Sequence, residues 1–143
     1  MVKRMIQSRR NLLAALLLSG NCASFAFGQT VVNVPPDPAP FFVGSNTVLN
    51  LNDTGVLPSG FSAFDGSILN ILGGTVGDGL SALTGSQINM SGGMIGRQFR
   101  VFDSAIFRYA GGVITDDFDS LAGSQIVIEG QCWPVEVSGI CFK

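Results

Sequence analysis

The acidic side chains of this chain are most concentrated in the run Asp116-Asp117-Phe118-Asp119. Carboxylate oxygens are the ligands that Ca²⁺ prefers in proteins. The spacing therefore makes Asp116, Asp117 and Asp119 the candidate metal ligands, with calcium as the one cofactor that these residues suggest. A solvated acidic corner that holds no ion is the simpler interpretation of the same residues, and the sequence favours it.

Cys132 and Cys141 are the two cysteines beyond the N-terminal segment, and both lie near the C-terminus. An even pair of cysteines in an exported chain predicts a disulfide, worth about 2–3 kcal/mol for a loop of this length. Their spacing differs from that of Cys-x-x-Cys redox pairs, and two thiols without a histidine cannot complete a zinc site. We therefore expect residues 131–143 to form a C-terminal cap closed by the Cys132–Cys141 disulfide.

General acid–base catalysis has few candidate residues in this sequence. The chain contains no histidine and no Gly-x-Ser-x-Gly motif. Arg100, Asp103 and Arg108 combine guanidinium and carboxylate groups, as the sites of solenoid polysaccharide lyases do, but so short a chain offers too small a groove for a polymer. The sequence therefore predicts no catalytic residues and a protein that is not an enzyme.

The first 28 residues have the three parts of an export signal. Four cations lie within the first ten residues, residues 12–18 are an apolar stretch, and Ala26-Phe27-Gly28 supplies small residues for cleavage before Gln29. The apolar stretch is shorter than the ~20 residues that span a bilayer. We expect a signal peptide at 1–28 and a secreted, periplasmic or surface-bound product without a membrane span. Residues 8–13 resemble a twin-arginine signal, so that route and the general secretory route both stay open.

The charge of the remaining chain excludes one class of partner. Four of the eight Lys and Arg residues lie in the leader, so the rest of the chain has four cations against ten acids and a net charge of −6. Nucleic acids and anionic membrane surfaces are bound by neutralising their phosphates with basic side chains. We therefore expect no nucleic-acid partner.

Comparison of the sequence with itself reveals a repeat of 19 residues. Residues 66–74 align with 85–93 and 104–112, and a partial copy begins at Gly123. Upstream of these, residues 49–55 form a degenerate copy that aligns when a one-residue gap is allowed. The repeat generates five apolar columns. Their members are Leu57, Val76, Ile95 and Ile114; Phe61, Leu80, Phe99 and Phe118; Phe64, Leu83, Phe102 and Leu121; Leu69, Ile88, Phe107 and Ile126; and Ile71, Met90, Tyr109 and Ile128.

A unit of 19 residues is too short for a pair of helices, and its internal glycines disfavour helix. Its alternating residues are typical of strands, and its Gly-Gly pairs are suited to tight corners. The sequence therefore predicts an all-β fold, a short parallel β-solenoid (β-helix) of about four 19-residue rungs at 47–130, preceded by a cleavable signal helix. We expect the five columns to fill its interior and the proline-rich residues 29–46 to be a linker or an N-terminal wrap.

The unit at residues 85–96, Gly-Ser-Gln-Ile-Asn-Met-Ser-Gly-Gly-Met-Ile-Gly, resembles the tandem repeats of exported bacterial β-solenoid proteins. Those repeats follow the pattern G-S-x-[VI]-N-[IM]-S-G-G-x-[VI]-G. The resemblance covers about 66–130 and weakens in the third copy, where Arg108 replaces the asparagine and Thr115 replaces the last glycine. It implies a structural or adhesive role outside the cell, and it implies no catalytic residues.

Asn50, Asn70 and Asn89 occupy equivalent positions of the repeat. They predict an outward ladder of amide hydrogen bonds, with a polar surface for sugars as the alternative. We therefore expect an exported, non-enzymatic structural or adhesive module. The alternatives are a carbohydrate-binding or polysaccharide-degrading β-helix protein, and a truncated remnant of a longer repeat protein. An extracellular glycan and a second copy stacked on the solenoid ends are the candidate partners.

Overall fold

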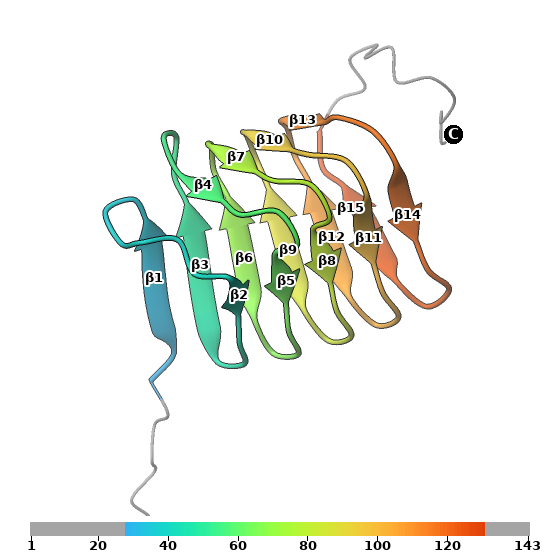
Figure 1. Cartoon of the computed structure of the whole chain (residues 1–143). Coiled ribbons are helices and arrows are strands. Elements are labelled where there is room, and N and C mark those ends of the chain that lie inside the picture. The colour runs from blue at the N-terminus through green and yellow to red at the C-terminus, as the bar shows by residue number, and fades with distance from the viewer. Residues whose placement is uncertain (1–27, 131–143) are drawn as a thin grey trace, which may run out of the picture.

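The computed structural model describes residues 28–130, and this part of the chain is an all-β parallel solenoid of about five rungs (Figure 1). The solenoid prediction is thus confirmed. Three parallel sheets form its sides. The large sheet contains β1 (Thr30–Val34), β3 (Thr47–Leu51), β6 (Ile68–Ile71), β9 (Gln87–Met90), β12 (Ile106–Tyr109) and β15 (Gln125–Ile128). The four-stranded sheet contains β4 (Val56–Leu57), β7 (Thr75–Val76), β10 (Met94–Ile95) and β13 (Val113–Ile114). The five-stranded sheet contains β2 (Phe42–Val43), β5 (Ser62–Ala63), β8 (Ser81–Ala82), β11 (Phe99–Val101) and β14 (Phe118–Ser120).

The register of the strands follows the repeat. Asn70 pairs with Asn89, and Asn89 pairs with Arg108, so equivalent residues 19 positions apart lie side by side. Asn50 pairs with Asn70 at a spacing of 20, because the corner at 52–55 is one residue longer than the corner at 72–74. The one-residue gap in the sequence is therefore located in a corner, where an insertion does not disturb strand pairing.

The Gly-Ser pairs of the repeat form the corner that leads into the large sheet. Gly66 and Gly85 adopt positive φ angles of 68° and 75°, which glycine reaches without strain. The hydroxyl groups of the following Ser67 and Ser86 donate hydrogen bonds of 2.6 Å to the carbonyl groups three residues before them. These serines are buried, so the hydrogen bond satisfies a polar group that has lost contact with water.

The Gly-Gly pairs form the next corner, where neighbouring rungs approach closely. Gly93 has a φ of 75°, and a Cβ atom there would lie 2.5 Å from the carbonyl oxygen of Gly73. A larger residue would push the two rungs apart. The Gly-Gly signature therefore reflects the stacking distance as well as the shape of the turn.

Four of the five predicted apolar columns fill the interior. Their members in the central rungs are completely or almost completely buried. Aromatic side chains dominate the C-terminal half of this core, where the ring of Phe99 lies 4.9 Å from that of Phe107 and 5.2 Å from that of Phe118. Edge-on and tilted ring contacts of this kind stabilise a core beyond the burial of area alone.

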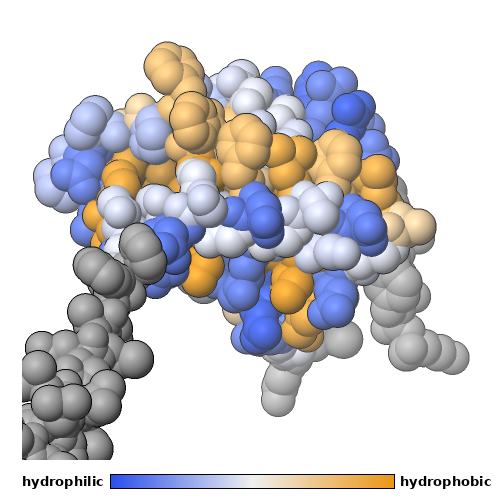
Figure 2. Space-filling model, turned by 90° about the horizontal axis from the view of Figure 1, so that it is seen from below, coloured by the Kyte–Doolittle hydropathy of each residue, from blue (hydrophilic) through white to orange (hydrophobic). Residues whose placement is uncertain are grey.

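The remaining column lies outside the solenoid, so the prediction that it fills the interior is wrong. Its members are Phe64, Leu83, Phe102 and Leu121. Phe64 and Leu121 are 44% and 42% exposed, and apolar residues gather along one side of the face seen in Figure 2. Successive residues of a strand point to opposite faces. With Phe61 inside, the next inward position is that of Ala63, and Phe64 falls on the outer side of the corner.

Residues 29–46, for which the sequence predicts a linker or wrap, contain two strands of the solenoid. β1 pairs with β3 from Thr30 to Val34, and β2 pairs with β5. Val34 and Val43 are buried in the core, and the proline-rich stretch connects them. The stacked region therefore begins one strand earlier in the large sheet than the repeat indicates.

The predicted signal peptide, apart from its last residue, and the predicted disulfide cap lie outside the described residues. Cys132 and Cys141 both fall in that second segment. Within residues 28–130, no helix has the length and apolar character needed to cross a membrane.

Candidate functional site

A ladder of asparagine side chains runs along the outer face of the large sheet. The Nδ2 group of Asn50 donates to Oδ1 of Asn33 at 2.9 Å, Asn70 donates to Asn50 at 2.8 Å, and Asn89 donates to Asn70 at 2.8 Å. The amides are partly buried, so water can hydrogen-bond to them only in part. Each ladder bond therefore satisfies polar groups that water reaches poorly. The predicted ladder is thus confirmed, and it includes Asn33, which the repeat comparison missed.

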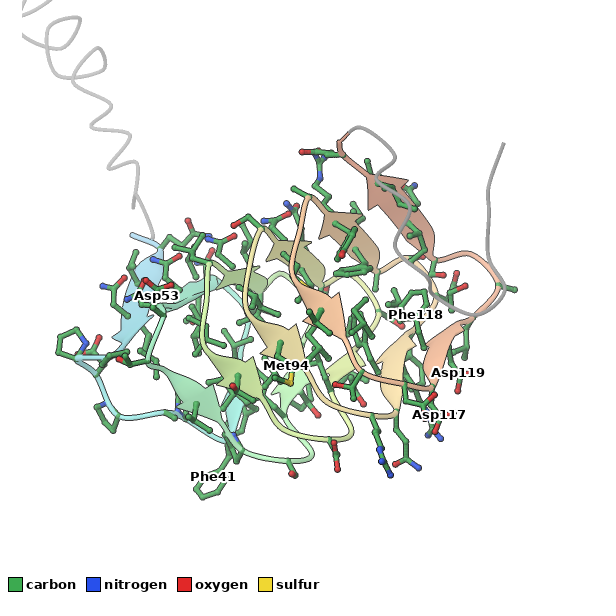
Figure 3. All side chains as sticks on the ribbon, turned by 90° about the horizontal axis from the view of Figure 1, so that it is seen from above. Phe41, Asp53, Met94, Asp117, Phe118 and Asp119 are labelled. Atoms are coloured by element: carbon green, nitrogen blue, oxygen red, sulfur yellow. The ribbon has the colours of Figure 1, made fainter. Side chains whose placement is uncertain are left out.

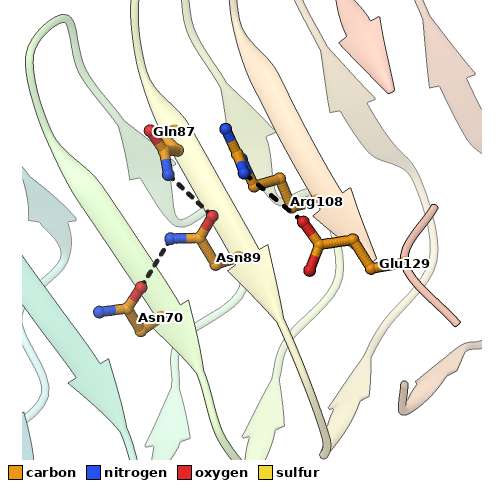
Figure 4. A network of polar contacts seen from close by, with 5 residues as sticks. All are labelled: Asn70, Gln87, Asn89, Arg108 and Glu129. Carbon is orange, nitrogen blue, oxygen red and sulfur yellow. Dashed lines mark hydrogen bonds and ion pairs between the residues drawn. The ribbon is translucent and has the colours of Figure 1, made fainter. Parts of the chain in front are cut away.

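The ladder has a direction because every amide donates toward the N-terminal end. The amide oxygens therefore all face the C-terminal end, where the oxygen of Asn89 accepts a hydrogen bond of 2.9 Å from Nε2 of Gln87 (Figure 4). Aligned hydrogen bonds polarise one another, so the oxygen end of such a chain carries the more negative potential. The next residue in this column is Arg108, whose positive charge suits that end.

Arg108 ends the ladder and forms an ion pair instead. Its Nη1 atom lies 3.5 Å from Oε1 of Glu129, and both side chains are about half exposed. β15 places Val127 opposite Arg108, so no amide is present to extend the ladder to the last strand. The outer face thus changes from neutral amides to a pair of charges within one rung.

A shallow groove of about 330 Å³ lies where the ladder meets this ion pair. Its polar lining consists of Asn70, Gln87, Asn89, Ser91, Arg108 and Glu129, and its apolar lining consists of Leu72, Met90 and Ala110. Donors, acceptors and both signs of charge are therefore present together. Such a surface can hydrogen-bond a polyhydroxylated molecule and contact its apolar faces.

The three candidate metal ligands do not form a cluster. Asp116 and Asp117 lie in the corner before β14, where Oδ1 of Asp116 accepts a hydrogen bond from the backbone N–H of Asp117. Asp119 lies on β14, 3.8 Å from Nε of Arg100. In Figure 3 Phe118 points into the solenoid between these exposed carboxylates. Within the described residues, no group of three or more His, Cys, Asp or Glu side chains could hold a metal ion.

The residues that the sequence suggested for lyase-like chemistry are also on separate elements. Arg100 lies on β11 of the five-stranded sheet, Asp103 lies in the corner after it, and Arg108 lies on β12 of the large sheet. Arg100 and Arg108 each have a different acidic partner, Asp119 and Glu129. The structure therefore does not assemble them into one site.

Asn33, Gln87 and Glu129 are the residues of the outer face that sequence reasoning missed. Asn33 lies 17 residues before Asn50, so a search at a spacing of 19 does not align the two. Gln87 bonds to Asn89 on the same strand, and Glu129 lies just beyond the end of β15 and pairs with Arg108. A comparison of columns detects neither contact. No family model, curated protein or solved structure matches this chain.

Proposed function

We propose that this chain is an exported, non-enzymatic module whose role is structural, as a rigid support or spacer at the cell surface, with adhesion through its side faces. The asparagine ladder carries this proposal. Its polar side chains bond to one another from rung to rung along the axis, and this arrangement strengthens the stack itself. A solenoid built in this way resists separation of its rungs.

Export is the part of this proposal that rests on the leader, and fractionation tests it. The full chain is expressed in a bacterium, and the mature N-terminus is determined in each fraction. We expect a product that begins near Gln29 outside the cytoplasm and is accessible to added protease at the surface or in the medium. A full-length product confined to the cytoplasm would overturn the proposal.

The structural role is tested by pulling single molecules of the exported chain. Replacing Asn70 and Asn89 together by alanine removes two bonds of the asparagine ladder and the bond that Gln87 donates to Asn89, so we expect a clear loss of unfolding force. Gln125→Ala is the matched control, because Gln125 is exposed on the same sheet outside the ladder. Equal forces for the double variant and the control would show that the ladder has no mechanical role.

Carbohydrate binding is a second candidate, and the groove at the end of the ladder favours it. Arg108 and Glu129 are half exposed beside amides and apolar side chains, which is a suitable lining for a sugar. We expect a glycan array to detect binding by the exported chain and loss of that binding in Arg108→Ala. An array without any bound glycan, or equal binding by the variant, would leave the structural role alone.

A further inference from the structure

The C-terminal end of the described solenoid leaves its core uncovered. β13, β14 and β15 are the last strands of their sheets. Ile126 and Ile128 are 37% and 61% exposed, whereas Leu69 and Ile71 in the same columns are fully buried. Ile114 and Phe118, the last members of two other columns, are only partly buried. Residues 28–130 therefore end in an apolar surface framed by three strand edges.

Some backbone groups of β15 point away from the preceding rung. The N–H groups of Gln125 and Glu129 donate to Ala105 and Tyr109 of the preceding rung. Residues of a parallel strand bond alternately to one neighbour and the other, so the backbone groups of Ile126 and Ile128 point to the position of a further rung. Strand edges of this kind pair readily with another segment.

At the N-terminal end, the outer edge of β1 is occupied at Asn33. There the backbone N–H of Asn33 donates to Oδ2 of Asp37 at 2.9 Å, and the N–H of Asp37 donates to the carbonyl of Asn33 at 2.7 Å. The prolines that follow β1 have no N–H group to offer. Head-to-tail stacking of two chains would have to break these contacts.

The chain itself continues from the open end for 13 residues, and two apolar residues of this segment keep the spacing of the repeat. Trp133 lies 19 residues after Ile114, and Val137 lies 19 residues after Phe118. Three residues separate Ile128 from Cys132, the same number that separates Tyr109 from Val113 at the corner of the previous rung. Both apolar residues thus occupy repeat positions whose members face inward in the described rungs.

We propose that residues 131–143 dock on the C-terminal end of the solenoid, with Trp133 over Ile114 and Val137 over Phe118. Pro134 follows Trp133 and lacks the N–H that the equivalent Thr115 donates to Ile95. Strand pairing is therefore incomplete at that point, and side-chain packing is the main contact. A proline in the final segment also blocks the addition of a further strand.

Trp133 is the one tryptophan of the chain, so its fluorescence reports directly on this contact. We expect the emission of the exported chain to be shifted to shorter wavelength than that of free tryptophan, with several-fold slower quenching by iodide. Both properties should be independent of protein concentration. Emission and quenching equal to those of free tryptophan would overturn the proposal, and so would shielding that develops only as the chain dimerises, which would identify a second copy as the occupant.

Two pairs of variants locate the contact. Val137→Asp places a charge at the inward position of the segment, and Val135→Asp places it two residues earlier at the position equivalent to Asp116. On the solenoid, Ile114→Asp alters the packed side chain, and Val113→Asp alters its exposed neighbour on the same strand. We expect a shift to longer wavelength and loss of protection from iodide in Val137→Asp and Ile114→Asp alone, with unchanged β-sheet circular dichroism in the Val137 variant. Equal behaviour within each pair contradicts the proposed register.

Discussion

The two ends of the solenoid differ in how the outer edge of the large sheet is occupied. At the N-terminal end, Asp37 uses its carboxylate and its backbone N–H to occupy the polar groups of Asn33, and prolines follow directly. At the C-terminal end, Ile126 and Ile128 of the last described strand of the large sheet, β15, are exposed. The difference shows that stacking alone does not protect a solenoid, because each end needs local residues that occupy the last edge.

The asparagine ladder also distinguishes the N-terminal rungs from the C-terminal rungs along the outer face. It begins at Asn33 in the first strand of the large sheet and stops at Asn89, two strands before the open end. The last two strands have Arg108 and Val127 in its place. The N-terminal rungs are therefore joined by core packing and by amide bonds, whereas the C-terminal rungs depend on the aromatic core and on an exposed ion pair.

The largest expected difference between the two ends concerns a single core column. Leu49 and Ile126 belong to the same inward column, but Leu49 is fully buried. We expect Leu49→Ala to lower the free energy of unfolding by about 2–5 kcal/mol. Ile126→Ala should cost only about 1 kcal/mol, because more than a third of that side chain already meets solvent. Urea unfolding of both variants measures the contrast, and similar losses would show that the C-terminal end is covered at this column.

The second prediction concerns the ladder in the N-terminal rungs. Asn70→Ala removes one hydrogen bond to Asn50 and one from Asn89 between partly buried groups, so we expect a loss of about 1–2 kcal/mol. Gln125→Ala on the same sheet near the open end should change stability by less than about 0.5 kcal/mol. Thermal unfolding of the two variants provides the comparison. A loss in Asn70→Ala no larger than that of the control would mean that water replaces the ladder at no cost.

The third prediction concerns the edge of β1 at the N-terminal end, where Asp37 occupies the backbone of Asn33. Asp37→Ala removes the acceptor for the Asn33 N–H, which we expect to cost about 1 kcal/mol and to expose the edge of β1. The variant should elute earlier on size-exclusion chromatography as its concentration rises. Asp37→Asn keeps an oxygen acceptor and should stay closer to the parent chain. A monomeric Asp37→Ala variant at every concentration would show that the prolines alone protect this edge.

The smallest effect is expected at the ion pair near the open end. Glu129→Gln removes the charge that faces Arg108, but both side chains are half exposed and the pair is screened by solvent. We expect a change in unfolding free energy of less than about 0.5 kcal/mol, with less dependence on salt than in the parent chain. A loss larger than 1 kcal/mol, far above that of an exposed pair, would indicate that the pair also fixes the last strand in place.

Much of the outer face could be predicted because it repeats. Asn50, Asn70 and Asn89 occupy one column of the sequence, and identical polar residues in adjacent parallel strands are close enough to bond. The partner of Arg100 could have been predicted in the same way, because Asp119 lies 19 residues further on and pairs with Arg100 across the sheet. The partner of Arg108 could not, because Val127 occupies its column and Glu129 lies 21 residues further on, just beyond the end of β15.

The amino-acid sequence by itself determined the period, the stacking of like residues and the positions of the corners, since glycines and serines at fixed offsets mark where the chain turns. Tertiary structure decided which columns face inward and where the stack begins. The apolar character of the Phe64 column predicts an interior position, yet the alternation of β5 turns Ala63 inward and Phe64 outward. Asn33 likewise joins the ladder at a spacing that the repeat does not contain. A period specifies which residues lie next to one another, but the face on which they lie depends on strand direction and corner length, and these are set when the rungs pack together.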